Sequence, residues 1–248
     1  MDSNIPSTLK FVRDTWGQIH GPEQVVMREQ TIQEAARQFG RQVLKTQFLL
    51  LYKVPDLEAL YCSPGVETLL GCSPAEFSFE WLYTRVHPDD ATLVAEATAL
   101  SARFADYLRH DVEGHVFTVD YRLLHCNGRW VRVLRQNFIV QLNETGQVVL
   151  CGSIYTDITH HKLTNDVRFL FSHPSFSAWV LNQLQPSKKE RLSVREQEIL
   201  SLTLQGNNSQ QIADRLYLSL HTVNTHRRNI NRKLGTRDLS YLLSHLDG

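Results

Sequence analysis

Apolar residues recur at helical spacing near the carboxyl end of the chain, in the stretch SLHTVNTHRRNINRKLG from 219 to 235. At about 100° per residue, Val223, Ile230 and Leu234 fall on one narrow stripe, as in a helix that packs one side on a core. The opposite side carries donors and acceptors without any carboxylate: His221, Asn224, Thr225, Arg228 and Arg232. The pattern predicts a helix whose outward face suits an anionic partner.

The preceding residues predict two further helices, separated by short turns. Ser193 and Glu196 have the S-x-x-E spacing of a capping box, so a helix begins there and ends at Gly206. Ser209 opens a second helix, and Ser219 is a good N-cap for the third. Two helices joined by a tight turn, the second with a polar basic face, form the helix-turn-helix arrangement, in which the second helix lies in the major groove of DNA.

A closing helix is predicted from Arg237 to Leu246. Its leucines recur at i, i+3, i+4 and i+7, which gives one apolar edge for the core of this helical domain. We expect the remaining apolar surface to pair with a second subunit through Leu239, Leu242, Leu243 and Leu246.

The central part of the chain predicts an antiparallel sheet. Short β-rich runs begin at residue 47, and helix formers dominate the stretch ATLVAEATALSARFADYL. Three longer strand candidates follow, joined by turns at Asn127-Gly128 and at 143–146. Two strands, short helices, one longer helix and a three-stranded meander give an α+β domain with helices on one face of the sheet.

Two helix starts are predicted around this sheet. We expect Pro88, by its fixed φ, and the carboxylates of Asp89 and Asp90, by capping N–H groups, to start the long helix. Asp157 or Thr159 is predicted to cap a helix that leaves the sheet.

The segments beside the sheet are more apolar than free linkers. Val25, Ile32 and Phe39 lie seven residues apart, which fits either a helix packed on the next domain or a helix that pairs with its twin in a dimer. A second apolar stretch, which includes Trp179, predicts a helical connector. The predicted organisation is an N-terminal helical segment at 1–46, a sheet domain at 47–162, the connector at 163–187 and a helix-turn-helix domain at 188–248.

Charge is distributed unevenly along a chain whose formal net charge is zero. From Lys188 to the end, ten Lys and Arg stand against six Asp and Glu, and no acid lies between Asp214 and Asp238. The four cysteines form no C-x-x-C pair, and the chain shows neither a signal sequence nor a membrane-length apolar run. We therefore expect a cytoplasmic protein with reduced thiols and a locally basic tail.

The tail resembles the LuxR-type DNA-binding domain over 192–246. The resemblance is carried by Leu192-Ser193-x-Arg195-Glu196, Leu200, Gly206, Ile212-Ala213, Leu216, Ser219, Thr222-Val223-x-x-His226, Ile230 and Lys233-Leu234-Gly235. It implies base contacts from Asn224, Thr225 and Arg228. The phosphate contacts are expected from Ser219, His221, Thr222, Arg227, Arg232 and Lys233.

Residues 47 to 162 resemble a PAS domain. The matching pieces are Tyr61-Cys62-Ser63-Pro64, His87-Pro88-Asp89-Asp90, Tyr121-Arg122-Leu123 with Asn127-Gly128-Arg129-Trp130, and Asp157-Ile158-Thr159. The family binds small ligands, haem or flavin beneath the sheet, or only dimerises. No cysteine lies in a photoreactive flavin motif, and His110 and His115 are interpreted as exposed loop residues, so no cofactor or metal is expected. Binding of an unidentified apolar ligand by this domain is the alternative that the sequence leaves open.

These features together predict a transcription regulator rather than an enzyme. The sequence contains neither a phosphate-binding G-x-x-x-x-G-K-[ST] loop nor a G-x-S-x-G nucleophile turn. We expect a homodimer that binds double-stranded DNA through its tail and senses a signal, or dimerises, through its PAS-like domain. The alternative is a protein-interaction module in which DNA binding is secondary. A weaker alternative is a haem or flavin sensor.

Overall fold

The computed structural model describes residues 5–20, 29–162, 164–183, 192–204, 207 and 209–233. The chain divides into two compact units, Met1–His173 and Pro174–Gly248, and each is described by itself. In these described ranges, no helix is long and apolar enough to cross a membrane.

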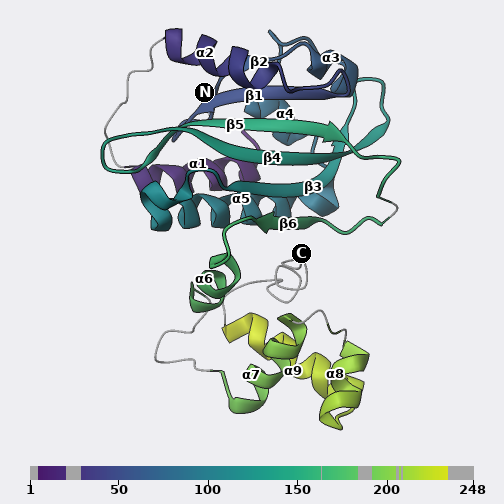
Figure 1. The fold of residues 1–248 in the computed structure, drawn as a ribbon. Helices are drawn as coiled ribbons and strands as arrows, with labels where there is room; N and C mark the ends of the chain where they lie inside the picture. Colours follow the sequence, from purple (N-terminus) through teal and green to yellow (C-terminus); the bar gives the residue numbers. More distant parts are fainter. Residues whose placement is uncertain are drawn as a thin grey trace. The chain divides into compact units, whose positions relative to one another are not determined.

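The first unit is built on an antiparallel sheet, as the sequence predicts (Figure 1). Adjacent strands follow the order β2-β1-β5-β4-β3-β6. Gly128 and Gly146 adopt positive φ values of 86° and 78° in the two hairpin turns, a conformation that glycine tolerates without strain. The strands are β1 (Gln47–Lys53), β2 (Glu58–Cys62), β3 (Val116–Leu124), β4 (Trp130–Leu142), β5 (Val148–Asp157) and β6 (Arg168–Phe171).

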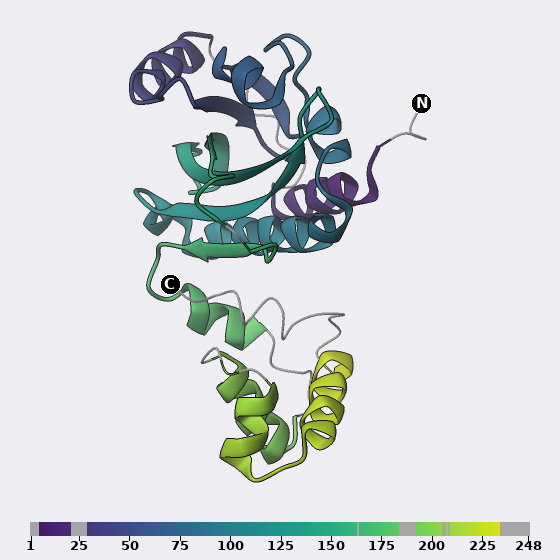
Figure 2. The same ribbon diagram turned by 90° about the vertical axis from the view of Figure 1, so that its right-hand side faces the viewer.

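Helices cover one face of this sheet and enclose the main core. Figure 2 shows the long helix α5 (Pro88–Leu108) with α1 (Ser7–His20) alongside it. Within the core, Phe48 of β1 stacks on Tyr155 of β5 with ring centroids 4.3 Å apart. The shorter members of this layer are α3 (Gly65–Leu70), α4 (Phe79–Thr84) and the 3-10 turn η1 (Arg109–Val112).

The helix α2 (Glu29–Gly40) lies on the opposite face of the sheet, over β1. Ile32 and Ala35 are buried in a cluster with Leu49, Leu51 and Leu150. The ring of Phe39 lies 4.6 Å from that of Phe138. Of the two interpretations of the seven-residue spacing, the structure supports packing on the adjacent domain, because Ile32 and Phe39 contact the chain's own sheet. Val25 lies outside the described residues.

The long helix starts differently from the prediction. Pro88 does occupy the first turn, but the side chain of His87 is the cap, since its Nδ1 accepts a hydrogen bond from the N–H of Asp89 at 3.2 Å. Asp90 is buried and accepts hydrogen bonds from Arg122 N and Nε at 2.9 and 3.0 Å. Asp90 therefore attaches α5 to β3 and does not cap the helix.

The prediction that Asp157 or Thr159 caps a helix after the sheet is also wrong. Asp157 Oδ1 accepts a hydrogen bond from Thr159 N at 2.9 Å, and Thr159 Oγ1 accepts one from Arg132 N at 3.0 Å. A turn follows, and the chain then enters β6. The two side chains fix an end of β5 to its neighbour β4 and cap no helix.

Part of the predicted helical connector is a strand. Arg168–Phe171 pairs with β3 as β6, with Phe169 and Phe171 buried, while α6 (Phe176–Gln183) is helical as expected. A buried ionic cluster secures this strand: Asp120 of β3 binds Arg132 of β4 and, at 2.7 Å, Lys162. The connector therefore begins inside the sheet domain.

Two glycines give a matched test of this packing. A Cβ on Gly65 would overlap the backbone carbonyl of Gln47, whereas a Cβ on Gly17, inside α1, would meet nothing within 4 Å. We expect Gly65→Ala to lower the melting temperature of the sheet domain, because α3 must move away from β1. Gly17→Ala is expected to raise the free energy of unfolding by about 0.5–1 kcal/mol. Thermal unfolding measures both, and equal effects of the two substitutions contradict the close packing of α3 on β1.

Candidate nucleic-acid interface

Three described helices make up the helical domain: α7 (Val194–Leu204), α8 (Ser209–Leu216) and α9 (Leu220–Lys233). The predicted capping box is present at the start of α7. Ser193 N donates to Glu196 Oε2 at 2.7 Å, and Glu196 N donates to Ser193 Oγ at 3.2 Å. Each side chain therefore satisfies a backbone N–H that the first turn leaves free.

The apolar sides of the three helices meet in one small core. Ile199 of α7, Ile212 and Ala213 of α8, and Val223 and Ile230 of α9 are all buried. Val223 and Ile230 are seven residues apart and lie on the same side of α9. Their burial fixes which side of α9 faces away from the core.

The turn between α8 and α9 ends one helix and caps the next. Tyr217 has a φ of 53°, in the left-handed region, and the following N–H of Leu218 donates to Ala213 O at 2.9 Å. Thr222 N then donates to Ser219 Oγ at 3.0 Å, so Ser219 is the N-cap of α9. The side chain of Tyr217 is 96% exposed, which leaves this aromatic ring beside the start of α9.

The three predicted base-contacting residues lie on one exposed face. Asn224, Thr225 and Arg228 are all exposed, as is His221 one turn earlier. Thr225 Oγ1 donates to His221 O at 3.0 Å, so its hydroxyl group is used within the helix. No acidic residue lies between Asp214 and Asp238 in the sequence, so no carboxylate on α9 neutralises this face.

The predicted phosphate contacts divide into two groups. Ser219 is exposed and Thr222 is half-buried at the first turn of α9. Arg227 Nη1 donates to Ser209 Oγ at 2.7 Å, and Lys233 Nζ contacts Glu196 Oε2 at 2.7 Å. Arg227 and Lys233 therefore hold α9 against α8 and α7, a structural role that sequence reasoning missed.

Glu196 is the buried partner of Lys233 in this contact between α7 and α9. Its side chain is only 4% exposed. Burial alone would raise its pKa, but the hydrogen bonds from Lys233 and from Ser193 outweigh burial and lower the pKa below the ordinary value. The carboxylate is therefore ionised near neutral pH and pairs with Lys233.

Several predicted features of this domain lie outside the described residues. They are Gly206, the side chain of Arg232, Leu234 of the predicted apolar stripe, and the closing helix with Leu239, Leu242, Leu243 and Leu246.

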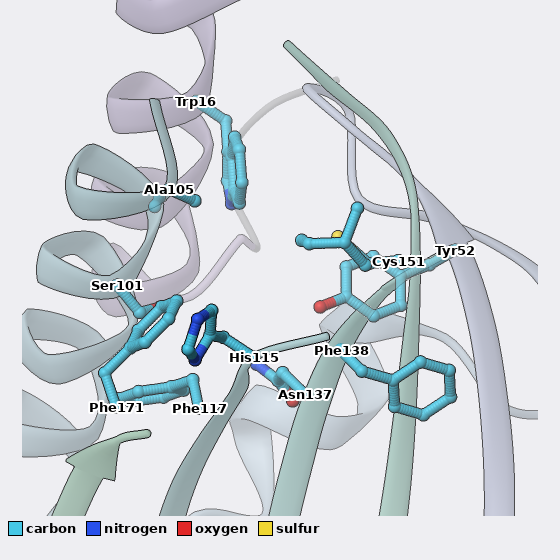
Figure 3. Close-up of a pocket in the computed structure, with 12 residues that line it drawn as sticks. Trp16, Tyr52, Ser101, Ala105, His115, Phe117, Asn137, Phe138, Cys151 and Phe171 are labelled. Carbon is cyan, nitrogen blue, oxygen red and sulfur yellow. The ribbon is translucent and has the colours of Figure 1, made fainter. Parts of the chain in front are cut away.

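The sheet domain contains a second candidate site, a cavity of about 30 Å³ between the sheet and the helical layer. Figure 3 shows the hydroxyl group of Tyr52 pointing toward its middle, with Trp16 of α1 on the opposite side. His115, predicted to be exposed, is half-buried and lines this cavity, whereas His110 is exposed as expected. Such a volume holds a water molecule or two.

Neither a metal centre nor a reactive thiol is evident at this cavity. In the ranges that the structure describes, no group of three or more His, Cys, Asp and Glu side chains comes together. All four cysteines are free thiols, and burial raises the pKa of Cys151, which lines the cavity, to about 12. Its thiol is neutral and unreactive at physiological pH.

Comparisons with known proteins identify both domains. Residues 190–246 match the family of bacterial regulatory proteins of the luxR family, and residues 59–154 match a PAS fold. No curated protein matches the chain significantly.

The solved structures that match parts of this chain are distant from it. A domain of a diguanylate cyclase with PAS/PAC sensor from Marinobacter aquaeolei is 24% identical over 46% of this chain and 99% of its own, with a TM-score of 0.39. A PAS domain from Colwellia psychrerythraea is 17% identical over 52% and 98%, also at 0.39. VqmA from Vibrio cholerae is 17% identical over 84% of each chain, at 0.32.

The ion pair beneath α9 can be tested with two matched substitutions on α7. Glu196→Gln removes the charge of a buried carboxylate, and we expect it to lower the free energy of unfolding of this domain by about 1–2 kcal/mol. Glu198→Gln, at an exposed ion pair with Arg195, is expected to cost less than about 0.5 kcal/mol. Hydrogen exchange of the amides in α7 and α9 measures both. Equal effects of the two substitutions contradict this role of Glu196.

The same pair predicts a pH dependence. Since the folded-state pKa of Glu196 is lowered, its stabilisation is present above the ordinary value of 4.5 and is lost as the pH falls through the folded value. Glu196→Gln should remove this contribution, so the two proteins should converge in stability at low pH.

Proposed function

We propose that this chain, which carries a LuxR-family regulatory domain behind a PAS-fold domain, is a sequence-specific DNA-binding transcription regulator that reads its operator with α9. The observation that supports this most directly is the exposed face of Asn224, Thr225 and Arg228. This face carries no acid, and the burial of Val223 and Ile230 on the other side of α9 holds it outward. The family match favours a regulator over an enzyme.

The three side chains are chemically suited to the major groove. A guanidinium such as that of Arg228 pairs with O6 and N7 of guanine, and an amide such as that of Asn224 pairs with N6 and N7 of adenine. The methyl group of Thr225 can contact the methyl group of thymine. In this proposal these residues provide sequence discrimination.

Phosphate contacts are assigned to the start and the outer flank of α9. Ser219 and Thr222 lie at its first turn, where free backbone N–H groups and the helix dipole favour a negative charge. His221 and Arg232 are also assigned to phosphates, because the helical wheel puts them on the outward side of α9. Arg227 and Lys233 already bind Ser209 and Glu196, so their contribution to phosphate binding is secondary to their structural one.

The regulator is proposed to act as a homodimer in the cytoplasm. Helix-turn-helix dimers read two half-sites about one helical turn of DNA apart, so the distance between two copies of α9 decides affinity. The leucines of the predicted closing helix, Leu239, Leu242, Leu243 and Leu246, are the proposed contacts between subunits. The first domain, by this account, senses a small molecule and alters the arrangement of the dimer.

A polar cluster in the sheet domain offers a route for this signal. Asp120 and Arg132 lie on neighbouring strands, on one face of the sheet. The other face of the same sheet lines the cavity. Lys162 joins them from the chain that leads to β6, and Arg168 N also donates to Asp120 at 3.2 Å. A change in the sheet therefore reaches the connector through hydrogen-bonded groups. A ligand shifts the regulator only if it binds one arrangement better than the other.

The DNA-reading role can be tested with duplexes selected from random sequence by the full chain. We expect Arg228→Ala to lose about 1–3 kcal/mol of discrimination at one base pair of the selected site, because one bidentate contact is removed. The measurement is a gel-shift titration of that site and of its single-base variants. Lys10→Ala, an exposed cation on α1, is the charge-matched control and should leave discrimination unchanged.

This experiment also separates the regulator from the rival interpretation, a protein-interaction module in which DNA binding is secondary. The rival predicts that no duplex is enriched, or that Arg228→Ala and Lys10→Ala have the same effect on every sequence. Either result contradicts the proposed function.

A further inference from the structure

A buried cation without a buried counter-ion lies in the core of the sheet domain. Arg135 projects from the inner face of β4 and is only 3% exposed. Its Nη2 donates to Thr98 Oγ1 of α5 at 2.6 Å, and its Nε has no hydrogen-bond partner. No carboxylate in the described ranges forms an ion pair with it, although other arginines of this domain, such as Arg122 and Arg132, do pair with acids.

The groups around Arg135 are neutral. Four tyrosines, Tyr52, Tyr83, Tyr121 and Tyr155, are close enough for its charge to act on their pKa values. Burial outweighs this effect and raises the pKa of each phenol, so none supplies a negative charge near pH 7. The ring of Tyr121 lies 5.5 Å from the guanidinium carbon. Hydrogen bonds and rings solvate the cation, but its charge is uncompensated.

An uncompensated charge in a protein core is unfavourable for stability. Buried charges are normally paired, and replacement of a buried ionic group by an apolar one of similar size is often stabilising. A packing role therefore does not account for arginine at position 135. A negatively charged group brought in by a ligand does account for it.

Arg135 does not itself line the cavity, but its neighbour on the same face of β4 does. Asn137 lines the cavity and projects from the same face of β4 as Arg135, two residues along. Ser153 Oγ donates to Asn137 Oδ1 at 2.8 Å, and Ser101, which also lines the cavity, donates to the carbonyl of Thr98, the residue that binds Arg135. The hydroxyl of Tyr52 points into the cavity in Figure 3; burial raises the pKa of this phenol, and the charge of Arg135 acts in the opposite direction.

We infer that this cavity binds a small organic acid, with the anionic group oriented toward Arg135 by Tyr52 and Asn137 and the apolar part held between Trp16, Phe117 and Phe171. The chemical class is a carboxylate or an equally acidic anion, rather than a neutral apolar molecule. The inference deepens the ligand-sensing part of the proposed function and rests on it.

The size of the cavity adds a mechanical consequence. A space of about 30 Å³ is too small for an organic acid, so lining side chains must move when one binds. Trp16 belongs to α1, which is also held to the sheet domain by the fully buried Leu9 and Val12 and by an ion pair of Arg13 with Glu80 at 2.6 Å. Because α1 is firmly packed, the structure predicts that ligand entry moves lining side chains such as Trp16 rather than the whole helix.

The test uses the full chain and pairs of acids with their neutral amides: acetate with acetamide, hexanoate with hexanamide, and benzoate with benzamide. Each pair has nearly the same shape and differs in charge. Isothermal titration calorimetry at pH 7 gives the two dissociation constants. We expect at least one acid to bind about tenfold or more tightly than its amide.

Two variants separate the charge from the fold. Arg135→Met should bring the ratio of the two constants close to one, whereas Arg135→Lys, which keeps the charge, should preserve a preference for the acid. Arg103→Met, at an exposed arginine of α5, is the matched control and should leave the ratio unchanged. If Arg135→Met does not fold, as judged by circular dichroism, the wild-type ratio and the Arg135→Lys ratio decide the matter.

The inference is overturned if no acid of the panel binds, if acids and amides bind equally, or if folded Arg135→Met keeps the preference. None of these measurements involves DNA. If the protein discriminates acids from amides but selects no duplex, the acid site stands and the proposed regulator role fails. If it selects a duplex but does not discriminate acids, the regulator role stands and the acid site fails.

Discussion

The burial of Val223 and Ile230 is the constraint on which the account of this protein depends. Both side chains lie on one side of α9 and pack against Ile199, Ile212 and Ala213. A helix has no freedom to rotate about its axis once such a stripe is buried, because rotation would expose apolar groups and bury cations. The outward position of Asn224, Thr225 and Arg228 is therefore a consequence of packing on the opposite side.

Some polar side chains of α9 hold the helix in place, and others are left exposed on its outward face. Ser219 caps its start, Arg227 binds α8 through Ser209, and Lys233 binds the buried Glu196 of α7. These contacts use side chains at the margins of the apolar stripe and at the ends of the helix. The middle of the outward face is left with no described partner elsewhere in the chain except the local bond from Thr225 to His221 O.

Sequence patterns predicted the elements whose signals are local. The S-x-x-E spacing, the turn glycines and the Val223 and Ile230 part of the stripe on α9 depend on neighbouring residues, and the structure contains each of them. The predictions failed where contacts with residues distant in sequence determine the role of a side chain or the type of an element. Asp90 has the position of a helix cap but binds Arg122, and β6 is only four residues long, so its partner β3 and the Asp120 cluster define it more than its own alternation does.

Arg135 is a charged residue at a core-facing position of a strand, and the sequence pattern alone contains this signal. In the stretch WVRVLRQ, Val131, Val133 and Arg135 alternate onto one face of β4, so an arginine is placed where the pattern demands an apolar residue. Such a break in a core-facing pattern is expected at functional positions. Base-contacting roles on α9 remain predictions, since exposure permits contact with DNA and does not demonstrate it.

Hydrogen exchange of the full chain, with and without a duplex selected from random sequence, tests the central claim most directly. Contact through the exposed face of α9 predicts slower exchange across residues 219–233 when DNA is bound, with the largest change around Asn224 to Arg228. Binding of the duplex with unchanged exchange in α9, and protection located instead on the sheet domain, would contradict the claim that this helix reads DNA.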